Sequence, residues 1–371
     1  MAIDELLARF HEVAVSPRKQ LDSYLAQGKK VVACAPVYTP EEIIHSMGLV
    51  PMGVWGAEME VSEAKKYYPA FICSVMQTVL ELGITGKYKG VSAIVIPSLC
   101  DSLKSLGQNW KYAVPDIPFI PMTYPQNRKP DYGIKFTRAG YERVISDLEV
   151  ATGAKFSEVA LANSNRIYNE HNAAMREFAE VAADHKISAA QRNDVFKSAW
   201  FMLKEEHTAL VRQLTEELKK APAEDEKVRV VVSGILADSP SLLNIFDKNG
   251  IKIVADDVAQ ESRQYRTDVP EMDSRPLDAL AQKFADMDNC TLLYDRDKKR
   301  VGYLVELAKK HNAEGVIVLM TKFCDPEEFD YVPIKRACEA AGLKHLNIEV
   351  DCQMVDYEQA GTMLQAFKEM A

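Results

Sequence analysis

Residues 29–56 read KKVVACAPVYTPEEIIHSMGLVPMGVWG, a pattern that predicts a strand, a loop, a helix and a second strand. The helix is expected to start at Pro40, because proline and the two glutamates after it are favoured in a first helical turn. It should end at Gly48, a typical helix stop. Strand, helix and strand in this order form a βαβ unit, whose two strands lie parallel in one sheet.

The same alternation continues towards the C-terminus. Residues 73–82, CSVMQTVLEL, predict a helix closed by Gly83 and Gly86, and residues 91–98, VSAIVIPS, form a nearly continuous apolar run. Such a run is typical of a parallel strand that is buried on both faces. We therefore expect an N-terminal helix and a first α/β domain in residues 1–135.

A later part of the chain repeats this plan. Residues 228–257, VRVVVSGILADSPSLLNIFDKNGIKIVADD, match residues 31–54 as strand, loop, proline near a helix start, glycine stop and second strand. Residues 315–325, GVIVLMTKFCD, likewise match residues 92–101, SAIVIPSLCD. Sequence identity between the copies is slight, so the repeat is expected in structure only. It predicts a second α/β domain in residues 228–371.

Between the two copies, residues 136–222 show helical periodicity with almost no strand signal. The charged, proline-containing stretch KKAPAEDEK, residues 219–227, is interpreted as a linker. The predicted fold class is α/β, with two Rossmann- or flavodoxin-like parallel-sheet domains joined by a helical segment.

The overall composition excludes several classes of protein. The chain has 371 residues, of which 47% are hydrophobic and 27% charged, which suits a globular protein of about two domains. Its net charge of −9 disfavours a nucleic-acid partner. No apolar run approaches the roughly 20 residues that span a bilayer, and the start, MAIDELLARFHEV, is acidic and amphipathic. We expect a cytoplasmic location and no membrane partner.

Seven cysteines in a cytoplasmic chain are expected to be reduced thiols, metal ligands or nucleophiles rather than a disulfide framework. Three of them, Cys73, Cys100 and Cys324, fall in a loop or a first helical turn, where free N–H groups favour the thiolate. Cys100 and Cys324 also follow matched strands, and ligands in open α/β sheets bind at that end. The other four are expected to pack as small apolar side chains: Cys34, Cys290, Cys338 and Cys352.

The three cysteines match no short motif, so a shared site is a hypothesis that rests on their matched strand ends. Three thiolates without a fourth would hold a [4Fe–4S] cluster by three irons, leaving the last iron for water, sulfide or substrate. Four acidic residues beside these thiols would help to keep its reduction potential low: Asp101, Asp325, Glu327 and Glu328. The N–H groups at the helix starts act in the opposite direction, and a low net potential is the prediction.

Other chemistries find little support in the sequence. It contains no GxGxxG, HExxH or GxSxG motif, and ITGKYKG, residues 84–90, lacks the features of a P-loop. Gly234 is interpreted as a loop requirement after a strand. Three histidines fall within helical patterns and are expected at a surface or an interface: His45, His207 and His311.

Three stretches together resemble the 2-hydroxyacyl-CoA dehydratases, relatives of the benzoyl-CoA reductases. They are KKYYPAFICSVMQTVLELGITG at residues 65–86, VIPSLCDSLKSLGQNWK at residues 95–111 and VLMTKFCDPEEFDY at residues 318–331. The similarity runs over essentially the whole chain, and the wording YYPAFICS is closer to the smaller, β, subunit.

The resemblance implies a lyase subunit that binds a [4Fe–4S] cluster through Cys73, Cys100 and Cys324. It further implies a homologous larger, α, subunit with its own cluster, and an ATP-dependent iron–sulfur activator that delivers one electron. The larger subunit would bind the acyl-CoA substrate, and the β-subunit cluster would relay or store the electron. The reaction is radical (ketyl) dehydration of (R)-2-hydroxyacyl-CoA to (E)-2-enoyl-CoA, as in amino-acid fermentation. Family members differ in whether they also carry flavin.

Two alternative readings stay open from the sequence. One is a non-catalytic iron–sulfur electron carrier on the same fold. The other is a two-lobed small-molecule binding protein whose cysteines are simply buried. The residues do not identify the acyl group, the CoA contacts or the groups that transfer protons.

Overall fold

The computed structural model describes residues 2–224, 227–272, 275–354 and 356–370. It contains two four-stranded sheets in which all neighbouring strands are parallel. The first sheet has the order β2-β1-β3-β4, and its strands are β1 (Val31–Cys34), β2 (Val50–Gly53), β3 (Ala93–Pro97) and β4 (Phe119–Met122). The second has the order β6-β5-β7-β8, and its strands are β5 (Val228–Gly234), β6 (Ile251–Val258), β7 (Gly315–Thr321) and β8 (Lys344–Val350).

The two sheets have the same strand order when each is numbered from its own first strand. This order is the flavodoxin-like one, in which the strand order reverses between the first and the third strand. The predicted fold class and the structural repeat are therefore confirmed.

Helices connect the strands of each sheet. Those of the first sheet are α3 (Glu41–Ser46), η1 (Ala64–Lys66), α4 (Ser74–Ile84) and α5 (Asp101–Ala113). Those of the second are α10 (Pro240–Lys248), η2 (Ser262–Tyr265), α11 (Pro276–Asp286), α12 (Lys299–Lys310), α13 (Asp325–Ala340) and α14 (Glu358–Glu369). Within the described residues, no helix is both long enough and apolar enough to cross a membrane.

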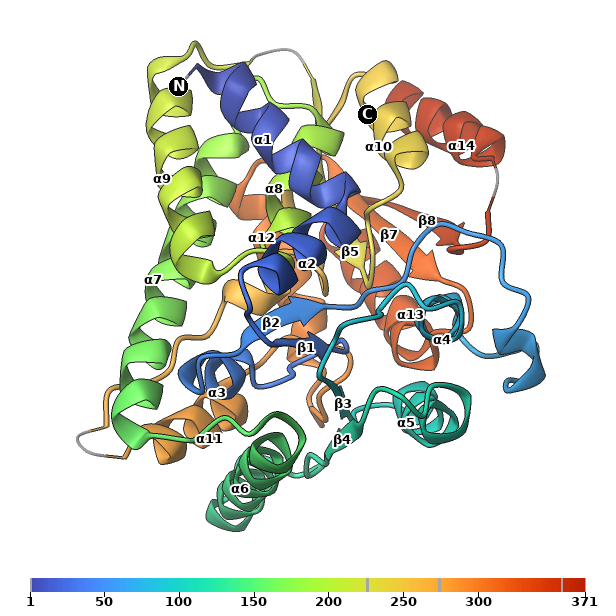
Figure 1. Cartoon of the computed structure of the whole chain (residues 1–371). Coiled ribbons are helices and arrows are strands. Elements are labelled where there is room, and N and C mark those ends of the chain that lie inside the picture. The colour runs from blue at the N-terminus through green and yellow to red at the C-terminus, as the bar shows by residue number, and fades with distance from the viewer. Residues whose placement is uncertain (1, 225–226, 273–274, 355, 371) are drawn as a thin grey trace.

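Four helices occupy the middle of the chain: α6 (Asp131–Thr152), α7 (Glu158–Ala182), α8 (Ala189–Ser198) and α9 (Lys204–Lys220). The expected linker at residues 219–227 thus begins inside α9, and its residues 225–226 lie outside the described part. The two N-terminal helices are α1 (Ile3–Val15) and α2 (Pro17–Ala26); α1 packs on α8 and α9 through a core that includes Phe10 and Phe178 (Figure 1). The domain boundaries drawn from the sequence stay a prediction.

The largest hydrophobic core contains residues from both halves of the chain. It joins the strands of the first sheet to Ile235 and Leu236 after β5 and to Leu280 and Phe284 on α11. Helix α11 packs against α6 and α7, although it lies between strands of the second sheet in sequence. The carboxyl ends of both sheets therefore share a common interior.

Candidate metal centre

Each of the three cysteines expected at one site is the N-cap residue of a helix. Cys73 precedes α4, Cys100 precedes α5 and Cys324 precedes α13. Cys100 and Cys324 follow the third strand of their respective sheets, so the repeat puts them in equivalent places. Cys73 ends the longer connection that follows β2.

These three helix starts border one hydrophobic core, because Cys73, Cys100 and Cys324 are each partly buried and packed against it. Burial raises the pKa of the Cys100 thiol to about 12, and the nearby Cys73 thiol adds to this rise. Burial likewise raises the pKa of Cys324 well above its ordinary value, with contributions from Cys73 and Cys100. For Cys73, whose pKa burial also raises, the smaller influences include Ser102 on α5 and Asp325 on α13. Side chains that follow strands of both sheets therefore influence the pKa values of one another's thiols.

The expectation that helix starts would hold ready-made thiolates is wrong for the chain by itself. The N–H of Leu103 does donate to Cys100 Sγ at 3.4 Å, as an N-cap allows. Burial nevertheless outweighs these donors, because apolar surroundings disfavour the charged form. A bound metal reverses the balance, since a coordinating thiol is deprotonated outright.

The chemistry of the donor set suits an iron–sulfur cluster, because the irons of such clusters take cysteine thiolates as ligands. Cys73, Cys100 and Cys324 would supply three of these ligands. Within the described ranges, no group of three or more His, Cys, Asp or Glu side chains is placed to hold a single metal ion.

A fourth thiol, Cys352, lies next to the Cys73 helix. Its backbone N–H donates to the hydroxyl of Ser74 at 3.0 Å, and its carbonyl accepts from the N–H of Met59 at 2.9 Å. Burial raises its pKa to about 12, with the Cys73 thiol among the smaller causes. The sequence predicts only a packing role for Cys352, which is partly exposed. Its place just after β8 was a signal, because Cys100 and Cys324 also follow strands.

The remaining three cysteines are buried side chains. Cys34 lies in β1 at 1% exposure, Cys290 is 5% exposed and Cys338 on α13 is 0% exposed. Their burial agrees with the packing role expected for them.

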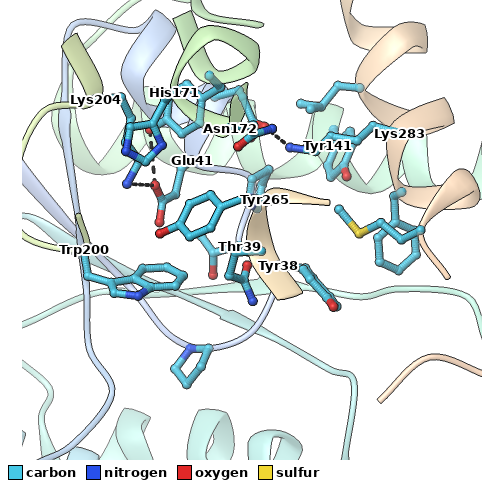
Figure 2. Close-up of a pocket in the computed structure, with 18 of the residues that line it drawn as sticks. Tyr38, Thr39, Glu41, Tyr141, His171, Asn172, Trp200, Lys204, Tyr265 and Lys283 are labelled. Carbon is cyan, nitrogen blue, oxygen red and sulfur yellow. Dashed lines mark hydrogen bonds and ion pairs between the residues drawn. The ribbon is translucent and has the colours of Figure 1, made fainter. Parts of the chain in front are cut away.

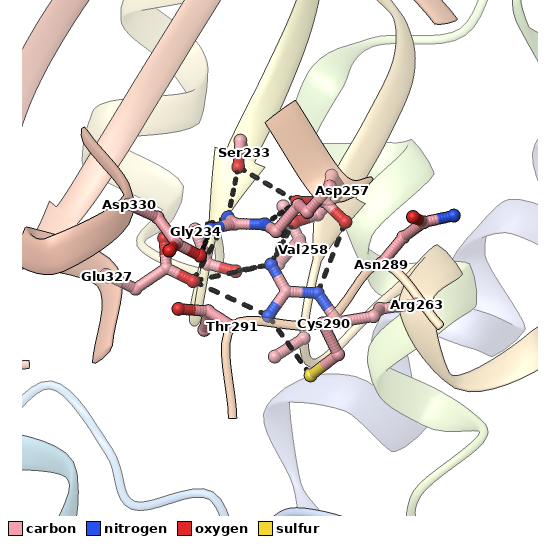
Figure 3. A network of polar contacts seen from close by, with 12 residues as sticks. Ser233, Gly234, Asp257, Val258, Arg263, Asn289, Cys290, Thr291, Glu327 and Asp330 are labelled. Atoms are coloured by element: carbon pink, nitrogen blue, oxygen red, sulfur yellow. Dashed lines mark hydrogen bonds and ion pairs between the residues drawn. The ribbon is translucent and has the colours of Figure 1, made fainter. Parts of the chain in front are cut away.

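A network of buried charges includes Glu327, three residues after Cys324 in the chain (Figure 3). Glu327, in the first turn of α13, accepts from Arg300 Nη2 at 3.1 and 2.9 Å and from Arg263 at 3.4 Å. Both arginines also donate to Asp257, the penultimate residue of β6. The distance is 2.7 Å from Arg300 and 3.1 Å from Arg263. Figure 3 shows Arg263 between Asp257, Glu327 and Cys290. The three arginines around Asp257 hold the pKa of this carboxyl below its ordinary value against the effect of burial.

A separate polar cavity of about 70 Å³ lies where the loop after β1 meets the helical segment (Figure 2). Its carboxylates are paired with distant lysines: Glu41 with Lys204 at 3.1 Å and Glu42 with Lys283 at 2.6 Å. The lining also includes His171 but none of the three cysteines. It is large enough for a few water molecules.

The family follows from comparison with known proteins. A family model described as 2-hydroxyglutaryl-CoA dehydratase, D-component, matches residues 36–371. The chain belongs to this family. The resemblance seen in the three cysteine-containing stretches is thereby confirmed.

Three dehydratase β subunits are similar to this chain over nearly their whole length. The (R)-phenyllactyl-CoA dehydratase beta subunit of Clostridium sporogenes is 46% identical over 99% of this chain and 98% of its own. The lactoyl-CoA dehydratase subunit beta of Anaerotignum propionicum is 45% identical over 99% of each chain. The (R)-2-hydroxyglutaryl-CoA dehydratase subunit beta of Acidaminococcus fermentans is 40% identical over 100% of each.

Proposed function

We propose that this chain is the β subunit of a 2-hydroxyacyl-CoA dehydratase and holds a [4Fe–4S] cluster through Cys73, Cys100 and Cys324. The proposal is supported by three N-cap cysteines that pack against one core shared by both sheets, in a member of this family. An ordinary packing role gives no reason for three thiols to occupy helix starts at one place.

The chain's own residues perform three tasks in this proposal. The three thiolates bind the cluster, and N–H groups of the helix starts, such as that of Leu103, donate to the sulfurs. The cysteines are partly buried, which limits the access of water to it. When bound, the cluster supplies one-electron chemistry at a potential that its surroundings set.

The substrate class follows from the relatives. Their names give three different acyl groups, phenyllactyl, lactoyl and (R)-2-hydroxyglutaryl, on chains that are 46%, 45% and 40% identical to this one. What they share is a 2-hydroxyacyl-CoA. We therefore assign radical dehydration of (R)-2-hydroxyacyl-CoA to (E)-2-enoyl-CoA, together with a homologous larger subunit, an ATP-dependent activator and a cytoplasmic location.

Anaerobic purification with the accompanying larger chain tests this function. We expect a brown preparation with about four irons per cluster. With activator and ATP it should dehydrate at least one member of a panel of 2-hydroxyacyl-CoAs. Iron without dehydration would favour an electron carrier, and absence of iron would favour a small-molecule binding protein. Flavin is read from the absorption spectrum of the same preparation.

Two alanine variants on one helix test the ligand assignment. Cys324→Ala removes a proposed ligand at the start of α13, whereas Cys338→Ala removes a buried thiol further along the same helix. We expect iron content to fall strongly in the first variant and to stay at the wild-type level in the second. Equal iron content in both would remove Cys324 from the site.

A further inference from the structure

Four carboxylates near the thiols differ sharply in their surroundings. The Asp101 side chain is 96% exposed, and Asp325 and Glu328 are also exposed. Glu327 is 1% exposed. Water and salt screen the three exposed charges, whereas a buried charge acts through a medium of lower dielectric constant. Glu327 is therefore the carboxylate whose field reaches furthest into the site.

Glu327 is held in one position by two arginines. Arg300 Nη2 donates to both of its oxygens, at 3.1 and 2.9 Å, and Arg263 donates at 3.4 and 3.5 Å. Glu327 and both arginines are buried. Hydrogen bonds to charged donors are short and directional, so the two arginines fix the orientation of this carboxylate.

The two arginines are in turn fixed to the second sheet. Arg300 donates to Ser233 on β5 at 2.8 Å and to Asp257 on β6 at 2.7 Å. Arg263 donates to the carbonyl oxygens of Gly234 at 3.2 Å and Asp257 at 2.6 Å. The position of Glu327 is thus set by strand ends and not by a mobile loop.

Glu327 is also joined to the cysteine by the backbone. Its N–H donates to the carbonyl oxygen of Cys324 at 3.0 Å, within the first turn of α13. After burial, the Glu327 charge is the largest influence that raises the pKa of the Cys324 thiol. The charge of Glu327 therefore contributes to the electrostatic potential at Cys324 Sγ.

We propose that Glu327 is a positioning residue that holds Cys324 in place and lowers the reduction potential of the cluster. This inference rests on the proposed function, because it requires a cluster at Cys324. A fixed negative charge repels the added electron, so the oxidised cluster is favoured. Arg300 and Arg263 hold the Glu327 carboxylate in place within the second sheet, whereas the other two cysteine helices, α4 and α5, belong to the first sheet.

Redox titration of three variants followed by electron paramagnetic resonance tests the proposal. Glu327→Gln keeps the shape and removes the charge, so we expect a higher midpoint potential. Glu327→Asp keeps the charge, so its midpoint potential should stay closer to that of the wild type. Asp330→Asn is the matched control: it removes a buried charge that binds the same Arg300 at 3.0 Å, but one turn further along the helix. Its potential should change less.

The signal to follow is the one that Cys324→Ala abolishes, which separates this cluster from any in the partner chain. An unchanged potential in Glu327→Gln, or an equal shift in Asp330→Asn, overturns the inference. Iron loss confined to Glu327→Gln supports the anchoring role, and iron loss in all three variants overturns it. A wild-type chain without a cluster would instead overturn the proposed function.

Discussion

Two buried histidines, His171 and His207, form a hydrogen-bonded pair between α7 and α9. His207 Nε2 lies 3.0 Å from the carbonyl oxygen of Val195, so this nitrogen carries the proton. His207 Nδ1 then accepts from His171 Nε2–H at 3.0 Å. Both rings are neutral, because burial lowers the pKa of His207 to about 3 and that of His171 well below its ordinary value.

This pair makes stability depend on pH in a defined direction. In the unfolded chain a histidine takes up a proton near pH 6.5, whereas folded His207 does so only near pH 3. The unfolded state therefore binds more protons between these values, and stability falls as pH decreases from about 6.5. Each histidine contributes up to about 1.4 kcal/mol per pH unit.

Urea unfolding at several pH values between 4 and 7 measures this slope. His207→Gln should reduce it, because glutamine takes up no proton between these pH values. The same slope in His207→Gln and wild type would contradict a neutral buried pair.

The sequence predicted some residues at this scale and missed others for a physical reason. Local sequence patterns predict Cys73, Cys100 and Cys324 at helix starts, and in the structure each is the N-cap residue of a helix. The sequence placed His207 at a surface or interface, and it is 0% exposed. Glu41 resembled an ordinary first-turn acid but is buried against Lys204, 163 residues away in the chain. A partner that distant leaves no local signal.

At the scale of elements, strand and helix order was predictable because apolar runs and helix stops are local features. The end of β5 shows a feature that was not predictable from the sequence. Gly234 was interpreted as a loop requirement, yet it is the last residue of β5 and pairs with Leu319 of β7. A Cβ at this position would lie 2.6 Å from the carbonyl oxygen of Leu319. The close approach of two strands, and not a turn, requires glycine here.

Gly234→Ala should therefore destabilise the second sheet. Forcing the added methyl group against a backbone oxygen costs about 1–3 kcal/mol. Gly302→Ala on α12 is the matched control, because a Cβ there meets nothing within 4 Å, and alanine favours the helix. Urea midpoints should fall for the first variant and stay equal or rise for the second. Equal midpoints would show that β7 can move away.

At the scale of the whole molecule, the two halves of the chain are tied together by more than the proposed cluster. Helix α11 packs on α6 and α7, and Phe284 stacks on Tyr124, which follows β4, with ring centroids 4.0 Å apart. Lys283 on the same helix reaches Glu42 of α3. The cysteine helices of both sheets can therefore meet at one place because the sheets already share an interior, which no local pattern in the sequence encodes.

The Lys283–Glu42 pair provides a test of this coupling. Both side chains are nearly buried, so Lys283→Met leaves an unpaired buried carboxylate, which costs about 3–5 kcal/mol. Glu42→Gln in the same chain removes that charge, so the double variant should recover much of the loss. Lys219→Met, which breaks an exposed pair with Glu177, should change stability little.

Unfolding is followed by a probe in each half, for instance fluorescence of Trp110 and hydrogen exchange of β7. We expect Lys283→Met to lower the midpoint of both probes together, because the pair bridges elements of the two sheets. A shift in only one probe would mean that the halves unfold independently. In that case the shared core would not hold the cysteine helices in register, and the metal centre would depend on the cluster itself for its assembly.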